Sequence, residues 1–314
     1  MAAAPTESSA PDLGTLQVQV LLDRLGFGPG IIDGRRGSSL VKALKGFQEA
    51  RGLRVTGEIN RATLEALRPD MVTPGVVGVA LSRWALAGPF VGPLPSDPAA
   101  QAKLATMGYS DVMEKLAERF HTSKAILVAL NSPQTRLRVG TVINVPNVLP
   151  AEIAYPDSLK PEWRDSLRQL SVSSSQPRAE RVVVDKSDGV LRVYGKDDKL
   201  VAQFPATMGS EHDPLPIGRW KIQGTAYLPP FHYNPDLFWD ADSKDDKQLL
   251  KSGPNGPVGV VWMDLDKPHY GIHGTSHPET IGRAESHGCI RLSNWDAARL
   301  AMMVRPGTPA VFQP

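Results

Sequence analysis

The stretch RVVVDKSDGVLRVYGKDDKLVAQFPATMG, residues 181–209, gives the clearest fold signal in this chain of 314 residues. Three short runs rich in β-branched residues are separated by polar turns at 187–189 and 195–198. Such turns between apolar runs are typical of β-hairpins. Further along the chain, RWKIQ, GVVWMDL and TPAVF predict strands, and residues 296–304 predict a single helix with Asn294 as its N-cap. We therefore expect a mostly β, sandwich-like domain over residues 181–314.

The residues ahead of this domain divide into two modules and two connectors. Residues 13–68 predict three short helices around a few leucines, and residues 69–100 form a proline-rich connector with one short strand near 76–81. Residues 101–148 predict two helices followed by a strand, an ααβ module. Residues 149–180, which include SVSSSQP, form a polar linker. The expected fold class is a multidomain α+β protein.

Serine, threonine and asparagine side chains favour helix N-caps because they accept a hydrogen bond from an unpaired backbone N–H. The candidate caps of the helices in the two modules are Ser38 or Ser39, Asn60, Ser110, and Thr122 or Ser123.

Composition and charge exclude several classes of protein. Lys and Arg number 35 against 33 Asp and Glu, so the formal charge of +2 gives no reason to expect nucleic acid as a partner. No apolar run approaches the roughly 18 residues that a membrane helix needs. The residues MAAAPTESSAPDLG lack the basic and apolar regions of a signal peptide. Either the protein is cytoplasmic, or an export signal was trimmed and replaced by a start methionine.

The segment IHGTSHPETIGRAESHGCIRLSN, residues 272–294, holds three of the seven histidines and the single cysteine. A catalytic cysteine needs a base to form its thiolate and donors for the oxyanion. His273 precedes Cys289 by 16 positions and can lie beside it across a folded loop, where an imidazole lowers the pKa of a thiol. Gly288 permits a tight turn, and Arg291 offers a fixed charge for a substrate carboxylate.

Other interpretations of this segment stay open. A lone cysteine is often a small buried hydrophobe, and Ser286 can simply stabilise the turn. Zinc is an alternative because His269, His273, His277, His287 and Cys289 supply suitable ligand types. However, the nearby prolines and glycines disfavour a helix that would align these histidines, and neither HExxH nor a second cysteine accompanies them.

The two N-terminal modules resemble families that bind the bacterial cell wall. Within residues 13–68, the order LGF, DG, AL, FQ, GL, VTG and ATL resembles the N-type peptidoglycan-binding domain. Within residues 101–148, the order of HTS, a helix, LN and VGTVINVP resembles a LysM module, although the usual opening strand is absent. The LysM resemblance implies either a glycan-binding module or a derived spacer.

The C-terminal domain resembles the YkuD-type L,D-transpeptidases. HGT at 273–275 and SHGCIRLSN at 286–294 match the signature of that family, and PIG at 216–218 and SGPNGPVG at 252–259 resemble its upstream segments. The resemblance implies a YkuD-like β-sandwich with no cofactor and no metal. It implies Cys289 as nucleophile, His273 as base held by the carbonyl of Gly274, and His287 as a residue that shapes the pocket.

The same resemblance assigns the remaining site residues. The backbone amides of His287, Gly288 and Cys289 would form the oxyanion hole. Arg291 would steer a substrate carboxylate, with Ser286 in support, while Asn294 is either a helix cap or a member of the site.

The resemblance implies acyl transfer from a tetrapeptide stem of peptidoglycan to an acceptor amine, with release of D-alanine and formation of 3-3 cross-links. Hydrolysis by the same site (an L,D-carboxypeptidase), attachment or release of a protein, and a non-catalytic wall-binding role stay open. Carbapenems would acylate Cys289. The substrate places the protein in the periplasm or cell envelope, so a trimmed signal peptide is the expected reason for its absence.

Overall fold

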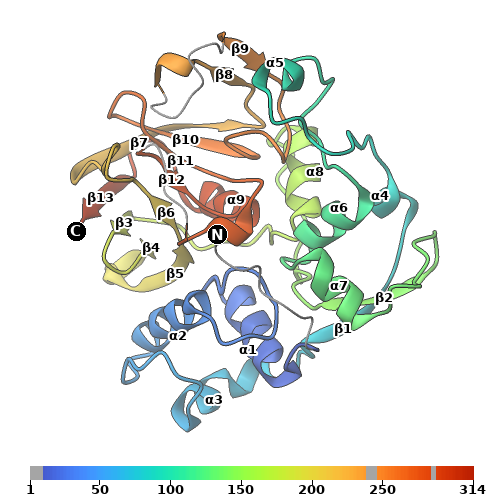
Figure 1. The fold of residues 1–314 in the computed structure, drawn as a ribbon. Coiled ribbons are helices and arrows are strands. Elements are labelled where there is room, and N and C mark those ends of the chain that lie inside the picture. Colours follow the sequence, from blue (N-terminus) through green and yellow to red (C-terminus); the bar gives the residue numbers. More distant parts are fainter. Residues whose placement is uncertain (1–9, 238–245, 284–287) are drawn as a thin grey trace.

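The computed structural model describes residues 10–237, 246–283 and 288–314 (Figure 1). A small helical module lies below a β domain, and a second small module containing helices and two short strands lies beside both of them. Within the described residues, we find no helix with the length and apolar character to cross a membrane.

The helical module contains α1 (Leu13–Arg24), α2 (Ser38–Ala50), α3 (Arg61–Leu67) and the short 3-10 turn η1 (Arg68–Asp70). The side chain of Asn60 accepts a hydrogen bond from Thr63 N, so the predicted cap of α3 is confirmed. The N-cap of α2 is Gly37, which has no side chain to accept a bond, and Ser38 is already helical. The three helices pack around apolar side chains such as Leu22, Leu44 and Phe47.

The strand predicted near 76–81 is confirmed, and it belongs to the second module. Strand β1 (Val76–Ala80), which lies in the expected connector, pairs antiparallel with β2 (Val142–Pro146). Between these strands lie α4 (Arg83–Leu86), α5 (Pro98–Gln101), α6 (Val112–Arg119) and α7 (Lys124–Leu130). The caps are Asp111 for α6, in place of Ser110, and Ser123 for α7. The expected ααβ order is therefore preceded by a strand and two further short helices, and the strand, 66 positions before β2, is the pairing partner of β2.

The expected second linker also contains regular structure. Helix α8 (Pro161–Gln169) buries Trp163 and Leu167 in the hydrophobic core of the β domain, together with Tyr155 and Val172. Most of its polar residues are exposed or partly exposed, so the segment has the composition of a linker in the sequence. Residues from 155 onward therefore belong to the packing of the β domain.

The β domain is built on one bent sheet. Its strands follow the order β5-β4-β3-β13-β7-β10-β11-β12-β6. They comprise β3 (Arg181–Asp185), β4 (Val190–Tyr194), β5 (Leu200–Pro205), β6 (Thr207–Met208), β7 (Gly218–Tyr227), β10 (Val261–Leu265), β11 (Gly271–His273), β12 (Ile290–Arg291) and β13 (Pro309–Gln313). A separate pair, β8 (Phe231–Tyr233) and β9 (Gln248–Leu250), lies at one edge (Figure 1).

The sheet nearly closes on itself. β7 serves both halves, because its first residues pair with β13 and its later residues pair with β10. The two ends of the strand order, β5 and β6, are separated in sequence by Ala206 alone. The prediction of a mostly β domain with hairpins at β3–β4 and β4–β5 is confirmed, and its two layers are parts of one continuous sheet.

Helix α9 (Asn294–Met303) fills the interior of this sheet with Trp295 and Leu300, which are fully buried. The cap of α9 is Ser293, whose hydroxyl accepts from Asp296 N. The expectation that Asn294 caps the helix is therefore wrong: Asn294 is its first residue and is fully buried.

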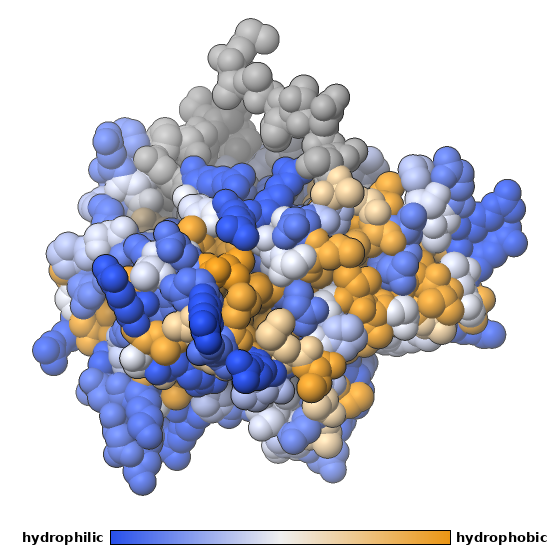
Figure 2. Space-filling model, turned by 90° about the horizontal axis from the view of Figure 1, so that it is seen from below, coloured by the Kyte–Doolittle hydropathy of each residue, from blue (hydrophilic) through white to orange (hydrophobic). Residues whose placement is uncertain are grey.

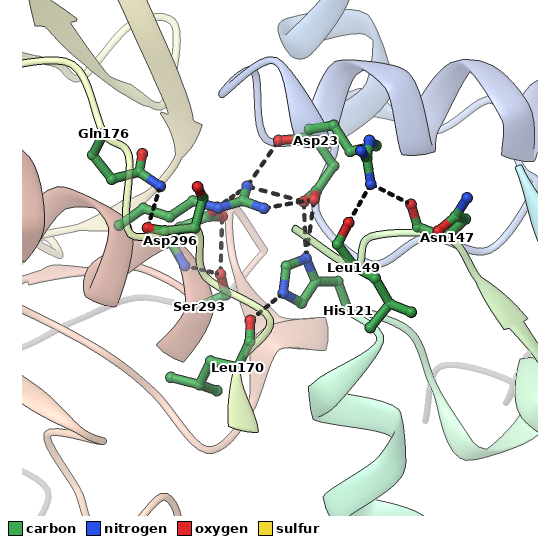
Figure 3. A network of polar contacts seen from close by, with 11 residues as sticks. Asp23, His121, Asn147, Leu149, Leu170, Gln176, Ser293 and Asp296 are labelled. Atoms are coloured by element: carbon green, nitrogen blue, oxygen red, sulfur yellow. Dashed lines mark hydrogen bonds and ion pairs between the residues drawn. The ribbon is translucent and has the colours of Figure 1, made fainter. Parts of the chain in front are cut away.

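A buried polar junction holds the three parts together (Figure 3). Asp23 of α1 lies 3.0 Å from Nδ1 of His121, and Nε2 of the same ring lies 2.7 Å from the carbonyl oxygen of Leu170. Both ring nitrogens thus lie within hydrogen-bond distance of oxygen atoms, which fixes the orientation of the ring. The ring also stacks on Trp295 of α9, with centroids 4.8 Å apart. One side chain from each part of the chain meets here.

Apolar contacts reinforce the junction. Leu16 and Val20 of α1 share a core with Leu116 and Phe120 of the second module, and Leu200 of β5 packs into the core of the helical module. On the lower face of the molecule, hydrophobic residues form a band broken by hydrophilic side chains (Figure 2). The shared cores show that apolar residues of the three parts pack across the boundaries between them.

Candidate active site

The pairing of β11 with β12 places the candidate residues on one face of the sheet. The two strands run parallel, with His273 opposite Arg291, and Cys289 immediately precedes β12. Because residues two positions apart on a strand point to the same side, Cys289 and Arg291 share a face. All three side chains line one cleft.

His273 is fixed by a hydrogen bond and by an aromatic neighbour. Its Nδ1 lies 2.7 Å from the carbonyl oxygen of Gly274, an acceptor, so Nδ1 carries the proton and the lone pair is on Nε2. The indole of Trp262 stacks on the ring with centroids 5.4 Å apart. Burial lowers the pKa of His273 to about 4, and the charge of Arg291 acts in the same direction. The ring is therefore a neutral base at pH 7.

Cys289 differs electrostatically from the expectation. Burial raises the pKa of its thiol, and this outweighs the hydrogen bond from the backbone of Gly271 and the charge of Arg291, which lower it. The sulfur lies 3.7 Å from the carbonyl oxygen of His269, a suitable acceptor for S–H. The expected lowering of the thiol pKa is wrong for this state, because desolvation dominates. The site pairs a neutral thiol with a neutral imidazole.

Two glycines are required by close approaches of their backbones. Gly288 has φ +88°, and a Cβ there would lie 2.7 Å from Cε1 of Tyr270. A Cβ on Gly274 would lie 2.1 Å from Oδ1 of Asn294. Both positions therefore exclude any larger residue.

The cleft has a volume of about 530 Å³. Its walls include several residues that the sequence analysis did not select: Trp262, Tyr270, Phe231, Tyr233, Pro98 and Gln101. The aromatic residues come from β8, β10 and the turn before β11, where alternation alone marks them as ordinary strand residues. Pro98 and Gln101 belong to α5, so a segment expected to be a connector forms one wall.

The structure separates the other candidate residues. Asn294 is buried behind the site, where its side chain contacts the loop at 254–260. His277 lies in the turn after β11 and pairs with Glu279. Ser286 and His287 fall outside the described residues. Across the three described ranges, no group of three or more His, Cys, Asp or Glu side chains is arranged to hold a metal ion.

Comparison with known proteins adds family information. Residues 179–312 match the model of the L,D-transpeptidase catalytic domain (YkuD), and residues 13–67 match that of the "Putative peptidoglycan binding domain". A Bacillus licheniformis protein named "Putative L,D-transpeptidase YkuD" is 28% identical over 204 residues, which cover 65% of this chain and 94% of that one. The protein of the same name from Bacillus subtilis is 54% identical over 55 residues, 18% of this chain and 34% of its own.

Among solved structures, the chain is similar to an L,D-transpeptidase from Mycobacterium smegmatis, with a TM-score of 0.35 and 22% identity. The match covers 42% of this chain and 58% of that chain.

Proposed function

We propose that the protein is a cysteine L,D-transpeptidase of peptidoglycan, because residues 179–312 match the model of the L,D-transpeptidase catalytic domain (YkuD). The observation that carries this proposal is the face shared by Cys289, His273 and Arg291 at β11 and β12, with Nδ1 of His273 bonded to Gly274. The peptidoglycan-binding domain at 13–67 supports the same substrate and a location at the cell envelope.

In the first step, Nε2 of His273 accepts the thiol proton as the sulfur of Cys289 attacks the carbonyl between the third residue of a tetrapeptide stem and its terminal D-alanine. A carbon–sulfur bond forms, and the oxyanion accepts hydrogen bonds from the backbone N–H groups of Gly288 and Cys289, with His287 as the third donor. The carbon–nitrogen bond then breaks. His273 returns the proton to the amine of D-alanine, which leaves.

In the second step, an acceptor amine of another stem attacks the thioester, and His273 accepts its proton. The carbon–sulfur bond breaks, the new amide is the 3-3 cross-link, and the thiol regains its proton. Because the resting pair is neutral, the proton transfer accompanies the attack on the carbonyl. Arg291, which lines the cleft, binds a substrate carboxylate.

The apolar walls of the cleft support a peptide substrate that excludes water from the thioester. Trp262 and Tyr270 line the cleft together with the reacting residues, and Pro98 and Gln101 of α5 line it as well. Exclusion of water favours the amine over hydrolysis, which distinguishes transpeptidation from carboxypeptidase activity at the same cysteine. A β-lactam of the carbapenem class would acylate the same sulfur.

The test is incubation of the full chain with tetrapeptide-containing muropeptides, followed by mass spectrometry. We expect cross-linked dimers and free D-alanine from the wild type, and neither from Cys289→Ala. His273→Ala should lose at least about a hundredfold in rate, as expected for loss of a general base. The matched control is His277→Ala, an exposed histidine four positions on, which should retain activity. Tripeptides without dimers would show that the protein acts as a carboxypeptidase and not as a transpeptidase. No reaction with the wild type would overturn the proposal.

A further inference from the structure

The buried side chain of Asn294 joins the second module to the catalytic domain. Its Nδ2 donates to Oε1 of Glu118 at 2.7 Å and to the carbonyl oxygen of Pro254 at 3.0 Å. Its Oδ1 accepts from the backbone N–H of Val260 at 3.2 Å. The amide thus has partners at both ends, which fixes its orientation.

The same amide packs against the residue that orients His273. A Cβ placed on Gly274 would lie 2.1 Å from Oδ1 of Asn294, and one placed on Gly259 would lie 2.0 Å from it. Asn294 therefore fills a slot between the two glycine backbones. The carbonyl of Gly274 is the acceptor for Nδ1 of His273 at 2.7 Å. The position of Asn294 thus bears directly on the peptide group that holds the imidazole.

Glu118 comes from α6, 176 positions earlier in the chain than Asn294. Its carboxylate is only 9% exposed, and its second oxygen accepts from the hydroxyl of Tyr109. Burying a carboxyl group here is costly unless its oxygens are hydrogen-bonded, and both are. An apolar residue could fill the same position without the cost of removing a carboxyl group from water. We therefore look for a role of this carboxylate besides packing.

Two segments near Glu118, at Met107 and at Glu114, form hydrogen bonds with the loop at 252–255. Backbone bonds join Met107 to Ser252 and Asn255, with Met107 N donating to Ser252 O at 3.0 Å and Asn255 N donating to Met107 O at 2.9 Å. On the same helix, Oε1 of Glu114 accepts from Nδ2 of Asn255 at 3.1 Å. The following residues of the loop, Pro257 and Val258, line the cleft. The second module therefore contacts the site through backbone and side chains together.

We infer that Glu118 is a positioning residue for catalysis: through Asn294 and the Gly274 carbonyl, this carboxylate of the second module holds the His273 imidazole in register with Cys289. The inference rests on the proposed roles of His273 and Cys289. It makes the second module a part of the enzyme's working site, in addition to any wall-binding role.

The single cysteine allows a test that does not require peptidoglycan. Alkylation of the full chain by iodoacetamide, followed by intact mass, reports Cys289 alone, and its rate from pH 5 to 10 follows formation of the thiolate. Glu118→Ala should lower the rate at pH 7 by about tenfold, because an imidazole that has moved out of register accepts the thiol proton less efficiently as the sulfur attacks. The loss should become smaller toward pH 10, where hydroxide can remove the thiol proton without the imidazole. Glu118→Gln should restore the rate to within about threefold, because its amide oxygen can accept from Asn294.

The control is Glu162→Ala, an exposed glutamate on α8, which should match the wild type. Circular dichroism and thermal melting report whether each variant folds. If Glu118→Ala does not fold, Glu118→Asp withdraws the acceptor by one methylene and keeps the charge, and the same loss at pH 7 is expected. An unfolded chain gives a different signature, because it exposes the thiol and raises alkylation throughout.

His273→Ala separates the two proposals. If it lowers the rate at pH 7 while folded Glu118 variants match Glu162→Ala, the inference about Glu118 is wrong and the proposed function stands. If His273→Ala leaves the rate unchanged, the base role fails, and the inference about Glu118 falls with it.

Discussion

Asp23 of α1 and Arg299 of α9 form a two-point ion pair, with Nη2 at 2.7 Å from Oδ2 and Nη1 at 3.1 Å from Oδ1. Both side chains are buried, and the two residues are 276 positions apart. The pair links the helical module directly to the core of the catalytic domain.

Arg299→Ala should lower the free energy of unfolding by about 3–5 kcal/mol, because it removes the buried guanidinium that pairs with the buried carboxylate of Asp23. Urea unfolding followed by circular dichroism measures the change. Arg178→Ala, which removes an exposed pair with Glu180, should cost less than about 1 kcal/mol. Equal effects of the two substitutions would contradict the structural role of the junction.

Acylation of Cys289 should persist well below pH 6.5. Burial lowers the pKa of His273 to about 4, so the base stays neutral in the folded protein where an ordinary histidine would already be protonated. We expect the acylation rate with a carbapenem, followed by intact mass, to change by less than about threefold between pH 7 and 5 and to be halved near pH 4. A midpoint close to 6.5 would show that the ring is solvated in solution.

Glu118→Gln should change how stability depends on pH. Burial raises the pKa of Glu118 to about 7, so the folded protein binds a proton that the unfolded chain releases near its ordinary pKa of 4.5. The stability contributed by this carboxyl is full below pH 4.5 and falls, by up to about 3 kcal/mol, as the pH rises to 7. The difference in unfolding free energy between wild type and Glu118→Gln should therefore shift in favour of the variant over this window. A constant difference would contradict it.

Gly274→Ala should abolish most of the activity, by about a hundredfold or more, since its Cβ would overlap Oδ1 of Asn294 and move the carbonyl that binds His273. Muropeptide turnover and melting temperature are the measurements. Gly224→Ala in β7 is the matched control, because no atom lies within 4 Å of a Cβ built there. Full activity in Gly274→Ala would contradict the close packing of Asn294 on this backbone.

Local patterns predicted much of the fold. The hairpins of β3, β4 and β5 follow from turns a few residues long. The cap at Asn60 is correct because its neighbours in the sequence, Ile59 and Arg61, are not capping residues. At α6, Ser110 and Asp111 are adjacent candidates, and the backbone conformation selects the second. The sequence predicts β1 as a strand but places it in a connector, because its partner strand lies beyond four helices and local patterns do not show which strands pair.

The candidate site was predictable at positions where the residue type is rare in this chain, as cysteine and histidine are. Because the chain has one cysteine with histidines close to it in the sequence, Cys289 and His273 could be chosen as candidates. Its surroundings were not predictable. The direction of the thiol pKa depends on burial, and the contact between Glu118 and Asn294 joins common residue types across 176 positions. The roles of Ser286 and His287 stay predictions.

The burial of α8 bears on how this catalytic domain can be exchanged between proteins. A recombination or truncation point at the apparent linker near residue 177 would leave Trp163 and Leu167 behind and open the core that they fill. A transferable unit has to begin before Tyr155, so the polar serine-rich stretch is a poor crossover point for domain shuffling. Even then, the carboxylate that reaches Asn294 stays with the donor chain. Exchange of modules in this architecture is therefore expected to preserve the fold more readily than the reaction rate.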